Sequence, residues 1–266
     1  MAIARSGAVE LHYESTGARE APVLLVMGLG MTATGWWRTD PVLAERFRVL
    51  SFDNRGVGRS ARPPGPYTVA QLADDAMAVL DAAGERSAHV YGISLGGMTA
   101  QEIALRHPDR VRRLVLAATT PGGTRARAPD RATLAFFERR GQMPAEEAVW
   151  ASVPYNYAAR TRSGAAQRIA EDIAQRLRFP IEPGPYMAQL AAAIGHDTHE
   201  RLGAIGAPTL VVHGAEDRMV HPDNARLLAE AIPRAELRVW PRTGHLLFTD
   251  EPAVDRDVLR FLSSPE

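Results

Sequence analysis

The stretch AHVYGISLGG, residues 88–97, joins an apolar run of strand length to a helical pattern that continues to Arg106. Its centre, GISLG at residues 92–96, fits the pattern Gly-x-Ser-x-Gly at a turn from strand into helix. Such a turn projects the serine hydroxyl outward, and the flanking glycines let neighbouring backbone pack closely. The five-residue pattern alone is weak, but its strand–turn–helix context predicts that Ser94 is a nucleophile.

Other apolar runs of strand length lie on both sides of this turn. Most are apolar on both faces, which indicates a central, largely parallel sheet covered by helices on both faces. Helical stretches at 68–83, 95–106 and 222–231 separate the later runs, and the first opens with Thr68 and Gln71 at capping-box spacing. This alternation is typical of an α/β fold. The predicted strands are 9–15, 22–28, 47–53, 88–94, 111–119, 207–214 and 235–241.

The alternation stops between residues 121 and 206. There Ile169, Ile173 and Leu177 recur every four residues, which indicates one apolar face of a helix. No strand-like run appears before Pro208. We therefore expect a core domain made of residues 1–120 and 207–266, with residues 121–206 inserted as a helical cap.

The composition excludes several kinds of chemistry. All 31 basic side chains are arginine, and the chain has neither lysine nor cysteine. Thiol nucleophiles, thiolate metal sites, lysine Schiff bases and P-loop lysines are therefore absent. The 31 acidic residues bring the formal net charge to zero, which argues against nucleic-acid binding. No run approaches the roughly 18 apolar residues of a membrane span, and the start lacks a signal-peptide pattern. We expect a cytoplasmic protein, and the sequence does not set its oligomeric state.

A nucleophilic serine needs a base, and His245 is the best candidate. It follows the last predicted strand in the segment PRTGH, residues 241–245, so it should lie at the same sheet edge as Ser94. The acid is expected between them in the chain, as in the order Ser, Asp/Glu, His. Asp217, directly after the strand 207–214, is the preferred acid, and Glu216 is the alternative.

Two other histidines lie close to that acid in the sequence. His213 is in the strand and His221 lies just beyond the turn. We assign neither of them the role of base, because the strand fixes the first and nothing positions the second.

Tetrahedral intermediates of acyl transfer need two hydrogen-bond donors for the oxyanion. The predicted strand 22–28 runs into Gly28-Leu29-Gly30, where glycines allow close backbone approach. The amide of Leu29, together with that of Leu95 after the serine, is the expected pair.

Four motifs together resemble the α/β-hydrolase superfamily, in particular its capped esterase, lactonase and carbon–carbon hydrolase branches. They are GISLGG (92–97), FDNRGVGRS (52–60), HGAED (213–217) and GHLLF (244–248). The resemblance covers nearly the whole chain and is least specific in 121–206. It implies Ser94 as nucleophile, Asp217 as acid, His245 as base, and the oxyanion hole at Leu29 and Leu95.

The resemblance also implies two further points. The stretch from Asp53 to Ser60 is similar to a structural turn of the family. The chain departs from the family at Met27-Gly28, where His-Gly is common. This departure bears on loop geometry and substrate preference, and similar Met-Gly loops occur in relatives that resemble polyketide methyl esterases.

One rival interpretation is dinucleotide binding. Residues 28–33 match G-x-G-x-x-A after a strand, and Asp53 follows at a spacing near that of a ribose-binding acid. However, Gly35 and Pro41 interrupt the segment where the crossover helix should run. A second rival is a non-catalytic receptor of the same fold.

We therefore predict a serine hydrolase that cleaves a carboxylic ester of a largely apolar small molecule through an acyl-enzyme, without metal or cofactor. A lactonase, a carbon–carbon hydrolase or a cofactor-free perhydrolase would use the same triad. Serine at position 94 excludes the epoxide hydrolases and haloalkane dehalogenases of this fold, which need aspartate there. No single arginine can be assigned to a substrate carboxylate. Aromatic residues expected to form the pocket are Trp36, Phe136, Trp150, Tyr155 and Tyr186.

Overall fold

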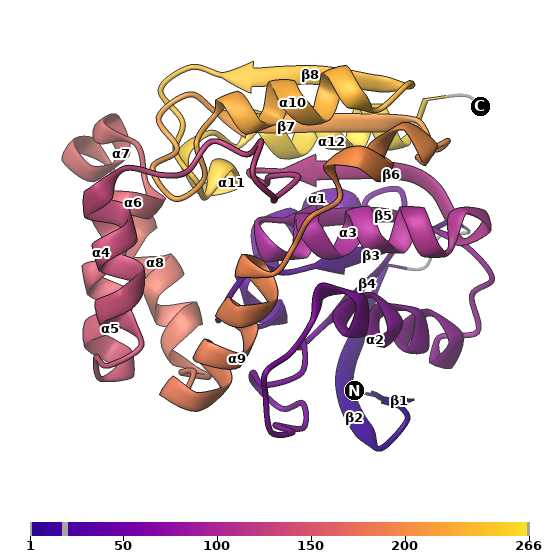
Figure 1. Ribbon diagram of the computed structural model, residues 1–266, viewed down its shortest axis with the longest axis horizontal. Helices are drawn as coiled ribbons and strands as arrows, with labels where there is room; N and C mark the ends of the chain where they lie inside the picture. The colour runs from indigo at the N-terminus through magenta and orange to yellow at the C-terminus, as the bar shows by residue number, and fades with distance from the viewer. Residues whose placement is uncertain (1, 18–20, 265–266) are drawn as a thin grey trace.

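The computed structural model describes residues 2–17 and 21–264, and within them it has one eight-stranded sheet (Figure 1). The strand order is β1-β2-β4-β3-β5-β6-β7-β8, with β1/β2 and β2/β4 antiparallel and all later pairs parallel. The predicted α/β class is therefore confirmed. The strands are β1 (Ala2–Ser6), β2 (Val9–Thr16), β3 (Pro22–Val26), β4 (Arg48–Phe52), β5 (Ala88–Ile93), β6 (Val111–Ala117), β7 (Thr209–Gly214) and β8 (Ala235–Trp240).

Each of the seven predicted strands is present, with ends that differ by a few residues. The additional strand, β1, was not predicted. It pairs with β2 across a turn at Gly7, whose φ of 59° suits glycine. Only Ala4 of β1 is buried, so the short segment shows too little apolar pattern to indicate a strand from sequence.

Helices cover both faces of the sheet (Figure 1). α2 (Val69–Ala82), α3 (Leu95–Arg106) and α10 (Asp223–Ala231) pack in the apolar cluster on one face. α1 (Thr39–Leu43) and α12 (Ala253–Leu262) pack on the other, with α11 (Leu247–Asp250) beside them. The predicted capping box is present, because Thr68 Oγ1 accepts from Gln71 N and Gln71 Oε1 accepts from Thr68 N. These helices fix the strands whose ends carry the candidate site.

Between β6 and β7 the described chain forms helices and no strand of the sheet. These helices lie at the carboxyl ends of the parallel strands (Figure 1). Ile169 and Ile173 of α8 are buried, as their spacing predicted. The elements are α4 (Arg131–Arg140), α5 (Ala145–Ala151), α6 (Val153–Asn156), α7 (Ala159–Gly164), α8 (Ala166–Leu177), α9 (Pro183–Ile194) and the 3₁₀ turn η3 (His199–Ala204).

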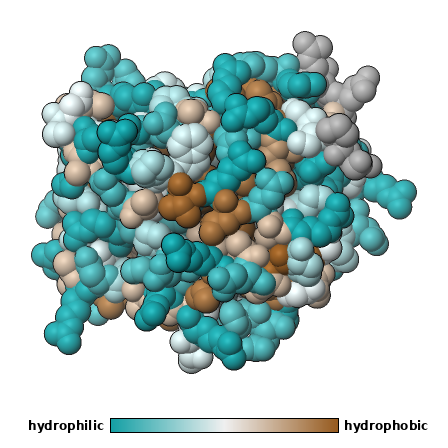
Figure 2. All heavy atoms as spheres, turned by 90° about the horizontal axis from the view of Figure 1, so that it is seen from above, coloured by the Kyte–Doolittle hydropathy of each residue, from teal (hydrophilic) through white to brown (hydrophobic). Residues whose placement is uncertain are grey.

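The surface seen from above is mainly hydrophilic, with a small hydrophobic group near its centre (Figure 2). The edge strand β8 exposes two large apolar side chains, Leu237 and Val239. None of the helices in the described ranges is long and apolar enough to cross a membrane.

Candidate active site

Ser94 lies at the turn from β5 into α3, in a backbone conformation that is unusual for serine. Its φ of 57° and ψ of −121° hold the residue in a strained turn. Glycines make this turn possible: a Cβ on Gly92 would lie 2.1 Å from Gly96 O, and one on Gly96 would lie 1.9 Å from Val26 O. The Ser94 amide donates to Ala117 O of β6 at 2.9 Å. Glycine at positions 92 and 96 therefore allows the strained turn that the motif predicted.

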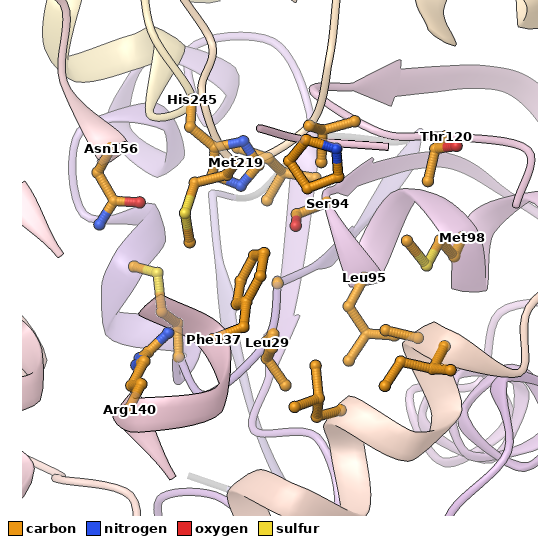
Figure 3. A pocket seen from close by; sticks show the side chains of 18 of the residues that line it. Leu29, Ser94, Leu95, Met98, Thr120, Phe137, Arg140, Asn156, Met219 and His245 are labelled. Carbon is orange, nitrogen blue, oxygen red and sulfur yellow. The ribbon is translucent and has the colours of Figure 1, made fainter. Parts of the chain in front are cut away.

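The turn after β7 and the loop after β8 bring Asp217 and His245 together. His245 Nδ1 lies 2.8 Å from Asp217 Oδ2. The other carboxylate oxygen, Oδ1, accepts from the amides of Met219 at 2.8 Å and Val220 at 3.0 Å. These bonds fix the carboxylate, and the bond to Nδ1 leaves His245 Nε2 free for another partner. His245 and Ser94 line the same cavity (Figure 3).

His213 is a further neighbour of this carboxylate to which sequence reasoning gave no role. Its Nε2 lies 3.0 Å from Asp217 Oδ2 and 3.1 Å from Val220 O. Both neighbours accept, so Nε2 carries a proton. Burial raises the pKa of Asp217, but the contacts with His245 and His213 lower it by a larger amount. The pKa of Asp217 therefore lies well below its usual range. Asp217 is therefore a carboxylate that two imidazoles stabilise.

The alternative acid and the other nearby histidine lie elsewhere. Glu216 Oε2 accepts from the amide of Ala159 in α7, at 2.9 Å. His221 is exposed, and its Nδ1 accepts from Asp223 N at 3.2 Å. Of the two carboxylates considered from the sequence, only Asp217 bonds His245.

The amides of Leu29 and Leu95 donate to no partner within the described ranges. Leu95 begins α3, where first-turn amides lack helical acceptors and the dipole favours negative charge. A Cβ on Gly28 would lie 3.1 Å from Ser94 Cβ, so the loop before Leu29 passes close to the serine. Both amides thus lie in segments adjoining Ser94.

The loop after β3 is held from two sides. Asn54 Nδ2 donates to Met27 O at 3.0 Å, and Gly30 N donates to Gln189 Oε1 of α9 at 2.9 Å. A Cβ on Gly35 would lie 2.6 Å from Met27 Cε, so Gly35 leaves room for the methionine side chain. The Met-Gly departure is therefore accommodated by the glycine that follows in η1 (Ala33–Trp36).

The cavity beside Ser94 has a volume of about 500 Å³, within the usual range for small-molecule sites. Its wall is mainly apolar and combines side chains of the core with side chains of the helices between β6 and β7 (Figure 3). Its polar side chains are Ser94, Thr120, Arg127, Glu138, Arg140, Asn156, Arg176, Asn224 and His245.

The five aromatic residues predicted for the pocket do not line this cavity, and that prediction is corrected. Trp36 packs in the core with its ring 4.8 Å from that of Tyr91. Phe136 stacks on Tyr155 at 4.5 Å. Trp150 is exposed, and Tyr186 borders a small neighbouring pocket.

Helix rotation explains part of this difference. Adjacent residues on a helix point about 100° apart. As a result, Phe137 and Met187 line the cavity, while Phe136 and Tyr186, one position earlier in each helix, do not.

The structure contradicts dinucleotide binding by Asp53. Its buried carboxylate accepts from Ala33 N at 2.9 Å and Arg59 N at 3.0 Å, and a Cβ on Gly58 would lie 2.3 Å from Oδ2. Only η1 and the short α1 follow Gly30 before β4. The segment is a structural turn, as the resemblance implied. Within the described ranges, no group of three or more His, Cys, Asp or Glu side chains could hold a metal ion.

Comparison with known proteins agrees with this geometry. The profile of the alpha/beta hydrolase fold family matches residues 21–252, and the chain belongs to this family of hydrolases. A protein of Caulobacter sp. (strain K31) named "Putative carbamate hydrolase RutD" is 35% identical over 97% of this chain and 98% of its own.

Two solved structures are also similar. The enol-lactonase of Burkholderia xenovorans LB400 has a TM-score of 0.89 and 26% identity, covering 99% of this chain and 100% of its own. A thermophilic esterase of Thermogutta terrifontis, solved with malate bound, has a TM-score of 0.83 and 27% identity, covering 98% of both chains. The chain therefore belongs to a lactonase- and esterase-like branch of the superfamily.

Proposed function

We propose that the protein hydrolyses the carboxylic ester bond of a largely apolar small molecule, an open ester or a lactone, through an acyl-enzyme on Ser94. The observation that carries the proposal is the 2.8 Å contact between His245 Nδ1 and Asp217 Oδ2, beside a strained serine on the wall of the same cavity. The similar esterase and enol-lactonase structures support this class of substrate.

In the proposed reaction, Ser94 Oγ attacks the substrate carbonyl while His245 Nε2 takes the hydroxyl proton. The carbonyl electron pair moves to oxygen, and the amides of Leu29 and Leu95 donate to that oxyanion. Asp217 holds the imidazole in the correct tautomer and stabilises its protonated form. The ester C–O bond then breaks as His245 gives the proton to the leaving alcohol.

Deacylation repeats these steps with water. His245 removes a proton from water as its oxygen attacks the acyl-enzyme, and the second tetrahedral intermediate uses the same two amides. Its collapse returns the proton to Ser94 and releases the carboxylic acid. The step consumes one water molecule and needs no other reactant.

We further propose that residues 121–206 act as a cap over this site. Phe137 and Leu190 from this segment line the cavity together with Met98 from the core. This shared wall supports a role of the segment in substrate selection rather than in the chemistry.

The test is labelling with a fluorophosphonate, read by mass spectrometry, together with turnover of p-nitrophenyl esters, a lactone and an aryl carbamate. The carbamate is included because of the name of the Caulobacter relative. We expect the label on Ser94, and loss of labelling and turnover in Ser94→Ala. Ser163→Ala, in the exposed part of α7, is the matched control. Full ester turnover by Ser94→Ala would refute the proposal. If the fluorophosphonate labels Ser94 but the protein turns over neither esters nor lactones, carbamate or carbon–carbon bond cleavage would be favoured.

A further inference from the structure

Two arginines on the cavity wall are buried without a counter-ion. Arg140, at the end of α4, is 6% exposed, and Arg176 of α8 is 8% exposed. Neither forms an ion pair with any carboxylate in the described ranges. Arg55 provides the contrast within the same chain, because this buried arginine donates to both oxygens of Asp75 at 2.6 and 2.7 Å. The two cavity arginines therefore lack the partner that a buried guanidinium normally has.

Local contacts hold both guanidinium groups in place without neutralising them. Arg140 Cζ lies 4.7 Å from the centroid of the Tyr186 ring. Arg176 Nη1 donates to Ser152 Oγ at 3.0 Å. Burial and the nearby charge of Arg176 lower the pKa of Arg140 to about 10, while Tyr186 opposes this shift, so Arg140 remains a cation at neutral pH. Each group is thus oriented, and within the described ranges no carboxylate pairs with it.

The acidic residue on this wall does not satisfy either arginine. Glu138 is exposed and, within the described ranges, forms no ion pair. The third arginine of the wall, Arg127, is also exposed. In Figure 3, Arg140 and Ser94 lie on different sides of the cavity. The buried positive charge is therefore separate from the proposed nucleophile.

We propose that Arg140 and Arg176 form an anion subsite, so that the substrate carries a carboxylate or a similar anionic group away from the bond that is cleaved. This inference rests on the proposed function for the position of the cleaved bond. A planar guanidinium binds a carboxylate with two parallel hydrogen bonds, and the buried setting strengthens them. The rest of the cavity would hold the apolar part of the substrate.

Direct binding tests the subsite without any turnover. The probes are pentanoate and its neutral counterpart 1-pentanol, measured by calorimetry on the whole protein. We expect pentanoate to bind at least about tenfold more tightly than pentanol, and Arg140→Met to remove at least about tenfold of that affinity, since a hydrogen bond between two charged groups is stronger than one between neutral groups. Arg139→Met, the exposed neighbour on α4, is the matched control. Equal affinities for the two probes, or an equal loss in Arg139→Met, would overturn the proposal.

Ester turnover tests the same subsite with two kinds of substrate, which carry a carboxylate either on the acyl side or on the alcohol side of the ester. Mono-p-nitrophenyl esters of dicarboxylic acids from glutaric to suberic present the anion on the acyl side, and their methyl-ended analogues are neutral. On the alcohol side, 4-acetoxyphenylacetic acid is compared with 4-tolyl acetate. We expect kcat/KM to favour at least one charged substrate by about tenfold or more, and Arg140→Met or Arg176→Met to lower that ratio towards one. No preference for either charged substrate in the parent protein would refute the subsite.

Melting temperatures distinguish an anion-binding role of Arg140 from a purely structural role. Because Arg140→Met removes an uncompensated buried charge, its melting temperature should be equal to or above that of the parent protein, and pentanoate should stabilise the parent protein more than the variant. A lower melting temperature together with an unchanged substrate ratio would show a structural role and overturn the proposal. If Ser94 escapes the fluorophosphonate while pentanoate still depends on Arg140, the hydrolase proposal fails and the subsite stands.

Discussion

His213 Nε2 and Asp217 Oδ2 lie 3.0 Å apart, and the same oxygen is 2.8 Å from His245 Nδ1. One carboxylate oxygen thus faces two imidazoles, one from β7 and one from the loop after β8. His213 Nδ1 is buried and has no hydrogen-bond partner in the described ranges. His213 therefore donates through Nε2, which faces two acceptors, while its Nδ1 faces none within those ranges.

This relationship predicts that His213 positions the acid. His213→Leu removes the donor to Asp217, and we expect kcat to fall by about tenfold, as for the loss of one hydrogen bond to a charged group, with little change in KM. His213→Gln, whose amide reaches a similar position, should restore most of the loss. Steady-state kinetics and melting temperatures of both variants check this. If both variants lose kcat equally, and the loss follows their loss of stability, His213 has only a packing role.

Asp217→Asn should lower kcat by about 10⁴-fold while the fold persists, because asparagine cannot stabilise the protonated imidazole or hold its tautomer. Glu216→Gln is the control, since Glu216 bonds the amide of Ala159 and not His245. Its kcat should remain close to the parent value, because Glu216 has no hydrogen bond to His245. Kinetics on one p-nitrophenyl ester compare the two variants. A larger loss in Glu216→Gln would identify it as the acid.

The raised pKa of Asp255 predicts that the stability of the protein depends on pH. Burial raises the pKa of Asp255 from 3.8 to about 7, and the hydroxyl of Thr39 and the charge of Arg256 oppose this rise. The pKa of the neighbouring Tyr91 is also raised, first by its own burial and then by Asp255. The folded state then holds this proton more tightly than the unfolded state. Stability from this group is present near pH 4 and is lost as the pH rises towards 7.

Asp255→Asn should therefore gain stability relative to the parent protein as the pH rises from 5 to 8, by no more than about 3 kcal/mol. Urea unfolding at both pH values measures the difference. Asp109→Asn, at an exposed position, serves as the control and should show no such trend. A constant difference between Asp255→Asn and the parent protein at both pH values would contradict the raised pKa.

The turn at Ser94 predicts opposite effects for two glycine substitutions. Gly96→Ala places a Cβ 1.9 Å from Val26 O and should destabilise the protein by about 3 kcal/mol or prevent folding. Gly164→Ala, at the end of α7, meets nothing within 4 Å and should add about 0.4–1 kcal/mol. Chemical denaturation of the two variants provides the comparison. Equal stability in both would mean that the backbone at Ser94 relaxes at little cost.

Local patterns were sufficient to predict most of the fold and the order of the candidate triad. Strands 22–28 and 88–94 are apolar on both faces, so their type and parallel pairing follow from burial alone. Ser94, Asp217 and His245 each follow a strand, and the carboxyl ends of parallel strands meet at one edge of the sheet. Such residues are placed by topology, without knowledge of any side-chain contact.

Residues whose role depends on side-chain direction could not be predicted. Arg140 and Arg176 are two of 31 arginines, and nothing in the sequence distinguishes a buried unpaired one from a surface one. The sequence does not distinguish Phe136 from Phe137 as a pocket residue, because the rotation of α4 about its axis does not follow from an irregular insertion. For His213, the spacing of four residues to Asp217 was visible, but the bend of the chain after β7 was not.

Gln189 of α9 accepts from Gly30 N at 2.9 Å and donates to Arg55 O at 2.8 Å. This side chain connects the segment between β6 and β7 to the loop that carries Leu29. Any transplant that replaces α9 with foreign sequence must therefore supply a side chain that bonds the same two backbone groups, or the loop that carries Leu29 loses this support.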